Sequence, residues 1–248
     1  MSPPVPSAAL AAAPVPGFAP FSLQHALCVA GFVLAVIVLL VAGRRAGPHE
    51  PRARRVVVIL LWLFIVVYNA YYLWPSRFDP AVSLPLQLCD LALLAAPLAL
   101  AGVAWARPLL YFWGLLLSSQ GFISPTVEVG PAHARFWLFW ISHAVIVGGA
   151  VYDLVVLRYR PRFADFAWAY GAGVAYILAM FEFNRRTGFN YGFVGSSTPG
   201  APTLLDHLGP WPGRVLWMIL LGGVVQFIAW ILWPLAARLG RTAPTPPR

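Results

Sequence analysis

The chain has 248 residues, of which 60% are hydrophobic and only 10% charged, and a soluble fold of this size cannot bury so much apolar surface. All 17 basic residues are arginine, so functions that need a lysine amine are excluded: retinal Schiff-base proteins, pyridoxal enzymes and P-loop ATPases. The net charge of +9 comes from short arginine clusters between apolar segments, a pattern that indicates membrane orientation and not nucleic-acid binding.

Seven apolar stretches follow a Pro- and Ala-rich N-terminal tail, and each is long enough to cross about 30 Å of hydrocarbon as a helix. In chain order they lie at 22–42, 55–74, 84–104, 108–124, 135–157, 163–183 and 212–236. The sequence therefore predicts an all-α, polytopic fold with one seven-helix membrane domain over 21–238. Residues 1–20 and 239–248 are expected to be disordered tails.

The arginines predict the orientation of these helices. Twelve arginines lie in the connections after the first, third, fifth and seventh stretches, against four in the other connections and Arg214 at a boundary. Because cytoplasmic loops are enriched in arginine, we expect the N-terminus outside and the C-terminus in the cytoplasm of a cell (plasma) membrane. The long connection 184–211 would then lie outside, either as a lid over a cavity or as a floppy loop.

Polar residues gather in the outer half of the predicted bundle. The candidates are Gln87, Cys89 and Asp90 in the third stretch, Ser118, Ser119 and Gln120 in the fourth, His143 in the fifth, Glu182 and Asn184 at the end of the sixth, and Asn190 and Tyr191 in the loop that follows. Polar groups are costly in hydrocarbon, so this pattern suggests a cavity open toward the outer leaflet. The alternative is that several of them lie at headgroup level or are hydrogen-bonded for packing alone. For Asp153, near the inner end of the fifth stretch, a structural ion pair with the nearby Arg158 and Arg160 is the simplest explanation.

Three chemistries fit this set. Acyl transfer would use Cys89, Ser118 or Ser119 as nucleophile and His143 as base, with Asp90 or Glu182 orienting the imidazole. A proton or cation pathway could use the same acidic groups and His143. Metal or haem binding lacks convergent ligands, so no metal and no cofactor are expected.

Four motifs carry a family resemblance. They are L-P-L-Q-L-C-D-L at 84–91, F-W-I-S-H-A at 139–144, N-Y-G-F at 190–193 and L-L-D-H-L-G-P-W-P at 204–212. With seven spans and an external N-terminus, they resemble the YwaF-type bacterial family of integral membrane proteins over about residues 20–238. That family is similar to a eukaryotic membrane acyltransferase that uses a cysteine to move polyunsaturated acyl chains onto ether lysophospholipids.

The resemblance implies a histidine in the fifth span that acts together with the nucleophile. His143 matches the position of that histidine. The resemblance also implies a nucleophile within an N-P-C-H motif, where this chain has Leu84, Pro85, Leu86 and Gln87. Cys89 follows Leu86 by three residues and could take its place on the same helix face.

We therefore expect a lipid-active acyltransferase or acyl hydrolase with membrane lipids as its partners. The assigned catalytic residues are His143, Cys89, Asp90, Ser118 and Ser119, and the assigned substrate-binding residues are Gln87, Gln120, Glu182, Asn184, Asn190 and Tyr191. A small-solute or proton-coupled transporter and a non-enzymatic structural or binding protein are the alternatives, and the oligomeric state is left open.

Overall fold

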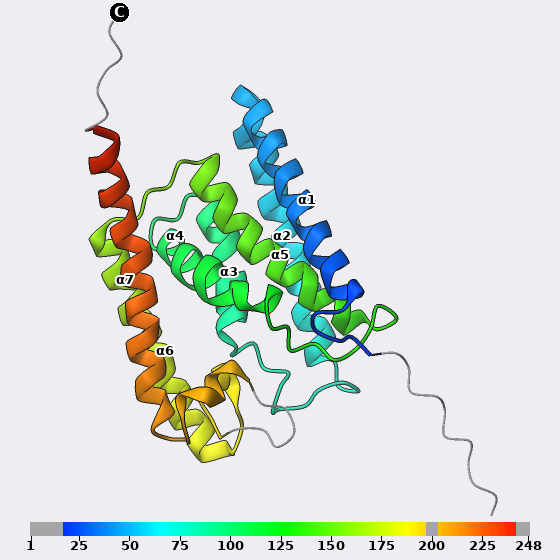
Figure 1. Cartoon of the computed structure of the whole chain (residues 1–248). Coiled ribbons are helices and arrows are strands. Elements are labelled where there is room, and N and C mark those ends of the chain that lie inside the picture. Colours follow the sequence, from blue (N-terminus) through cyan, green and yellow to red (C-terminus); the bar gives the residue numbers. More distant parts are fainter. Residues whose placement is uncertain (1–16, 197–202, 242–248) are drawn as a thin grey trace, which may run out of the picture.

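The computed structural model describes residues 17–196 and 203–241, and the described part of the chain is all-α (Figure 1). Its seven α-helices are α1 (Leu23–Arg45), α2 (Glu50–Leu73), α3 (Leu88–Leu100), α4 (Ala106–Leu109), α5 (Ala134–Val155), α6 (Phe163–Thr187) and α7 (Arg214–Arg241). The shorter helical segments are η1 (Gly47–His49), the π-helical η2 (Leu110–Leu117), η3 (Ser118–Phe122), η4 (Tyr191–Phe193) and η5 (Leu204–Leu208). The predicted all-α class is confirmed.

Among the described residues, five helices are long and apolar enough to cross a membrane: α1, η1 with α2, α5, α6 and α7. Most side chains of α1, α2 and α7 are exposed although they are apolar, as expected for helices that face lipid. The chain is therefore a multi-pass membrane protein.

The third and fourth predicted spans take a different form. In the region predicted as 84–104, only the 13 residues of α3 form an α-helix. Residues 84–87 are not helical, and Gly102 adopts a positive φ of 91° just after the helix. The region predicted as 108–124 is divided among α4, η2 and η3, whose wider and tighter turns replace one regular α-helix. Seven complete membrane crossings consequently stay a prediction.

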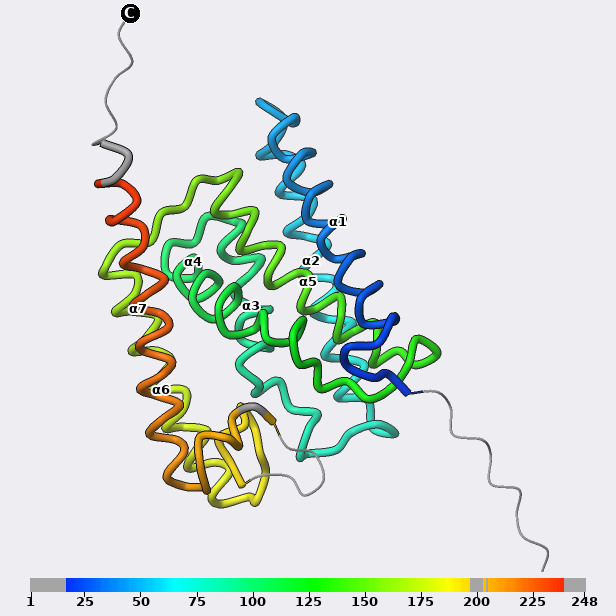
Figure 2. Tube along the Cα trace, in the orientation of Figure 1, coloured from blue at the N-terminus to red at the C-terminus, as the bar shows by residue number. Residues whose placement is uncertain are grey.

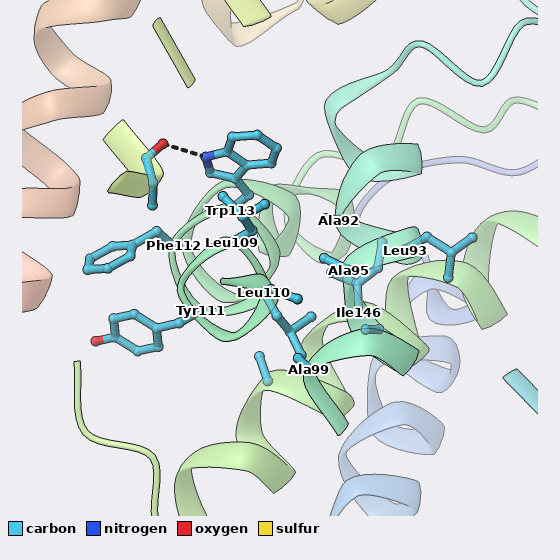
Figure 3. Packing of buried hydrophobic residues seen from close by; sticks show 14 of the residues in the cluster. Ala92, Leu93, Ala95, Ala99, Leu109, Leu110, Tyr111, Phe112, Trp113 and Ile146 are labelled. Atoms are coloured by element: carbon cyan, nitrogen blue, oxygen red, sulfur yellow. Dashed lines mark hydrogen bonds between the residues drawn. The ribbon is translucent and has the colours of Figure 1, made fainter. Parts of the chain in front are cut away.

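The core lies around α3 and η2. Figure 3 shows alanines of α3 packed toward Leu110 and Ile146, and small side chains of this kind let helices approach closely. Gly114 lets η2 and α5 approach closely, since a Cβ there would lie 2.9 Å from Cγ2 of Ile146. The buried Trp113 indole nitrogen donates a hydrogen bond to the Ala169 carbonyl (3.0 Å), which ties η2 to α6. This packing holds the first turn of α3 between neighbouring helices.

The connections gather at two ends of the bundle, as the chain trace in Figure 2 shows. We call one of them the Tyr191 end; it contains 17–22, 74–87, 123–133 and 188–196 with 203–213. We call the other the Arg160 end; it contains 46–49, 101–105 and 156–162. At the first end, the Phe18 amide donates to the Glu128 carbonyl (2.9 Å); at the second, the Trp168 indole donates to the Trp105 carbonyl (3.0 Å). These are the two groups of connections that the arginine count assigned to opposite sides.

Residues 1–16 and 242–248 of the two predicted tails lie outside the described residues. In the described part of the N-terminal tail, Phe18 is buried and packs against Phe136 and Trp140. At the other end α7 continues to Arg241, so the helix extends beyond the predicted domain boundary at 238.

Candidate functional site

The first turn of α3 is held by a buried carboxylate. Asp90 accepts hydrogen bonds from the Gln87 backbone amide (3.0 Å) and from the Tyr68 hydroxyl of α2 (3.0 Å). The Gln87 side-chain oxygen accepts from the Gly192 amide (2.8 Å). A carboxylate at this position satisfies an unpaired amide and interacts favourably with the helix dipole. Gln87 and Asp90 therefore meet as the cap and the third residue of α3, not as two side chains on one helix face, and both fix the start of α3.

Cys89 lies beside this carboxylate, at the second residue of α3. Its thiol is free and half-buried. The Tyr68 hydroxyl of α2 donates to the adjacent Asp90 carboxylate, and the Tyr176 hydroxyl of α6 donates to the Leu86 carbonyl just before α3. We call Tyr68, Cys89, Asp90 and Tyr176 the Cys89 cluster. The cluster brings a thiol, a carboxylate and two phenols together from α2, α3 and α6.

The loop after α6 closes over the segment that precedes α3. Tyr191 is fully buried, and its hydroxyl donates to the Pro80 carbonyl (2.8 Å) and accepts from the Leu84 amide (3.0 Å). Burial raises the pKa of this phenol, so it stays protonated. Asn184 is also buried, and its side-chain amide donates to the Tyr191 carbonyl (2.8 Å) and accepts from the Tyr191 amide (2.9 Å). This part of the connection 184–211 is therefore bonded to the bundle.

Two further contacts complete the cap, as we call the loop 188–196 over the segment that precedes α3. The Tyr176 hydroxyl donates to the Leu86 carbonyl (2.8 Å), and a Cβ at Gly192 would lie 2.4 Å from that hydroxyl. Gly192 also has a φ of 65°, so both its backbone and the space around it require glycine. Asn190 accepts from the Gly195 amide (2.9 Å) and so shapes the same loop. The assigned substrate-binding residues Asn184, Asn190 and Tyr191 thus support the cap with their polar groups.

His143 lies buried in α5 with a defined ring orientation. Its Nδ1–H donates to the Phe139 carbonyl (2.8 Å), because a carbonyl can only accept, and this leaves Nε2 as an acceptor. The Phe139 ring lies 4.3 Å from the imidazole, centroid to centroid, and a Cβ at Gly121 would lie 2.6 Å from Nε2. Phe139, rather than Asp90 or Glu182 as predicted, orients the imidazole.

His143 and Cys89 lie at similar depth on adjacent helices. A Cβ at Gly149 would lie 3.8 Å from the Ala96 Cβ, which marks a contact between α5 and α3. From that contact, His143 lies about 9 Å and Cys89 about 10 Å toward the Tyr191 end, at 1.5 Å per residue. The segment η3 packs against both helices. The nucleophile and base expected from the sequence thus belong to neighbouring elements.

Four other predicted residues make separate contacts. Glu182 lies on the surface of α6, where it forms ion pairs with Arg185 (2.8 Å) and Arg186 (2.5 Å), and Gln120 is exposed on η3. The hydroxyls of Ser118 and Ser119 donate to carbonyls of the preceding turn, at 3.0 Å and 3.2 Å. These residues do not join the Cys89 cluster through any hydrogen bond found among the described residues.

Sequence reasoning did not assign Tyr68, Tyr176, Gly121 or Gly192 to the site. Tyr68 could have been found, since it is a polar residue near the outer end of the second stretch, whereas Tyr176 lies in an apolar helix with no distinguishing pattern. Within 17–196 and 203–241, no group of three or more His, Cys, Asp or Glu residues could hold a metal ion.

Comparison with known families gives one match: a sequence model of the TMEM164 family matches residues 20–235. No curated protein and no solved structure matches the chain. The match does not bear on the YwaF-type resemblance that the motifs suggested.

Proposed function

The chain belongs to the TMEM164 family, and we propose that this membrane protein transfers acyl chains between lipids through a thioester formed on Cys89. The observation that carries the proposal is the position of the Cys89 sulfur. This free, half-buried thiol is carried by the second residue of α3, at a depth similar to that of the buried His143 imidazole.

This position suits a nucleophile that must carry negative charge. The positive end of the α3 dipole lies at this turn and favours negative charge, on a thiolate as well as on the oxyanion of a tetrahedral intermediate. The neighbouring Asp90 carboxylate opposes this charge, and its hydrogen bonds from Gln87 and Tyr68 reduce that opposition. The two phenols hold this turn in place, since Tyr68 donates to Asp90 and Tyr176 donates to the Leu86 carbonyl.

His143 is the proposed base. Its Nδ1–H is held by the Phe139 carbonyl, so Nε2 can accept a proton from the thiol and later return it. Because Gly121 lies directly against Nε2, any larger side chain there would displace the imidazole. The structural support is the shared depth of His143 and Cys89 and the contact of η3 with both of their helices.

The reaction balances without a cofactor. The Cys89 thiolate attacks the ester carbonyl of a diacyl phospholipid; the carbon–sulfur bond forms, the ester carbon–oxygen bond breaks, and the glycerol oxygen takes the proton from the base. The hydroxyl of a lysophospholipid then attacks the thioester carbonyl. A new carbon–oxygen bond forms, the carbon–sulfur bond breaks, and the proton returns to sulfur. Water in place of the lysophospholipid would give hydrolysis.

Purified protein in mixed micelles tests this proposal with a labelled diacyl phospholipid as donor and an ether lysophospholipid as acceptor. Mass spectrometry measures lipid products and the acyl adduct on intact protein. We expect Cys89→Ala to abolish both, and Cys28→Ala, which removes the other half-buried thiol, to leave both unchanged. His143→Ala and Gly121→Ala should each slow transfer by 10²-fold or more, about the range of general acid–base catalysis.

Several outcomes would contradict the proposal. Full activity in Cys89→Ala would exclude the thioester, and loss of activity only in Ser118→Ala would assign a serine nucleophile. Wild-type protein that gives neither turnover nor an acyl adduct would favour the transporter or structural alternative.

A further inference from the structure

We propose that the Arg160 end carries a binding site for the phosphate headgroup of an anionic phospholipid, separate from the Cys89 cluster. A groove of about 630 Å³ lies where the connection between α5 and α6 meets α7 (Figure 1). Its lining is formed mainly by Arg160, Pro161, Arg162, Trp230, Trp233 and Pro234. Two arginines and two tryptophans therefore meet at one end of the membrane helices.

Arg160 is held in place with donors left over. Its Nη1 donates to the carbonyls of Leu154 (2.8 Å) and Tyr159 (2.7 Å), and its guanidinium carbon lies 4.8 Å from the centre of the Trp233 ring. Both hydrogen bonds use one nitrogen, so Nε and Nη2 have no acceptor among the described residues. A fixed guanidinium with unused donors is suited to phosphate oxygens.

Arg162 adds a second positive charge to the groove. Its side chain is 83% exposed and reaches the Asp165 carboxylate only at 3.7 Å. That carboxylate already accepts a shorter hydrogen bond from the Arg162 backbone amide (2.8 Å). Asp153, the other nearby acid, is bound by Arg107 (2.7 Å). The groove lining itself contains no carboxylate, so an anion is the complementary ligand.

The aromatic wall indicates that the anion belongs to a lipid. The Trp233 indole donates to the Tyr111 hydroxyl (3.0 Å), and Trp230 packs edge-to-face on Phe163 at 5.1 Å. Phe227, which is 43% exposed, lies 5.4 Å from Trp230 and continues this apolar face along α7. Tryptophans favour the membrane interface, and basic pockets between membrane helices attract anionic headgroups. The acyl chains of the lipid would lie along the Phe227 side.

Native mass spectrometry of the full chain can test the site with phosphatidylglycerol and phosphatidylcholine as probes. We expect phosphatidylglycerol to bind at least about fivefold more tightly, since each arginine near a lipid surface contributes about a factor of five. Replacing both groove arginines, Arg160→Gln with Arg162→Gln, should weaken phosphatidylglycerol binding by about 25-fold by the same rule and leave phosphatidylcholine binding unchanged.

Matched variants separate this effect from loss of charge or of folding. Arg52→Gln with Arg55→Gln removes two exposed arginines of α2 outside the groove lining and should preserve the lipid preference. Arg162→Gln alone changes an exposed side chain and should still weaken binding about fivefold, even if Arg160→Gln proves unstable. An equal effect of the α2 pair, or an unchanged preference in Arg162→Gln, would overturn the proposal. Competition by free glycerol phosphate at concentrations that match the lipid would assign the groove to a soluble phosphate instead. Because this assay measures binding alone, its result is independent of acyl transfer.

Discussion

Asn184 offers a direct test of the cap over α3. Its buried side chain makes two hydrogen bonds to the backbone of Tyr191, one as donor and one as acceptor. Asn184→Ala leaves the Tyr191 amide without a partner, at a cost of about 1–3 kcal/mol, whereas the Tyr191 carbonyl keeps its longer hydrogen bond from the Val194 amide (3.3 Å). We expect a total destabilisation of about 2 kcal/mol, which lowers Tm by about 4–8 °C in a chain of this size.

The measurement is thermal unfolding of purified protein in detergent, followed by hydrogen exchange of the 190–196 backbone. Thr187→Ala is the matched control: it also removes a side-chain hydrogen bond on α6, to the Phe183 carbonyl, but at an exposed position. It should change stability by less than about 0.5 kcal/mol. If Asn184→Ala unfolds within about 1 °C of wild type and exchange at 190–196 stays slow, the cap does not depend on this side chain and the reasoning fails.

Two other predictions concern the ion pair between α4 and α5 and the orientation in the membrane. Arg107→Gln should destabilise the protein more than Asp153→Asn in thermal unfolding, because it leaves the more buried charge alone: the Asp153 side chain is 3% exposed and that of Arg107 26%. A buried charge without its partner costs about 3–5 kcal/mol, and the opposite order of stability would contradict this. Ser196→Cys should react with an impermeant maleimide in intact cells and His49→Cys only after lysis, since the arginine excess places 44–55 in the cytoplasm; the reverse pattern would invert the orientation.

The sequence alone determined the fold class. Hydrophobic stretches of about 20 residues can satisfy their backbone in a membrane only as helices, so composition and length suffice to predict α1, α2, α5, α6 and α7. The same information did not give the broken form of the third and fourth stretches. Hydropathy averages over a window, and it cannot distinguish one regular helix from an α, π and 3-10 succession such as 106–122.

Part of the candidate site was also accessible from the sequence. The spacing of Gln87 and Asp90 pointed to a shared helix face, but Gln87 is extended and precedes α3, and the two residues meet through a hydrogen bond from the Gln87 backbone amide to the Asp90 carboxylate. An ion pair was expected for Asp153, but its partner is Arg107 and not the nearer Arg158 or Arg160. Sequence proximity favoured the wrong arginine because only folding brings the Arg107 side chain to Asp153, 46 residues further along the chain.

Tertiary structure decided which polar groups meet. Glu182 and Asn184 are two residues apart, yet one lies on the surface with two arginines and the other is buried against Tyr191. Residues two apart on a helix point to different sides, and only the packing of α6 determines which side faces the bundle. The arrival of Tyr68 and Tyr176 at the first turn of α3 likewise depends on long-range packing, which no local pattern encodes.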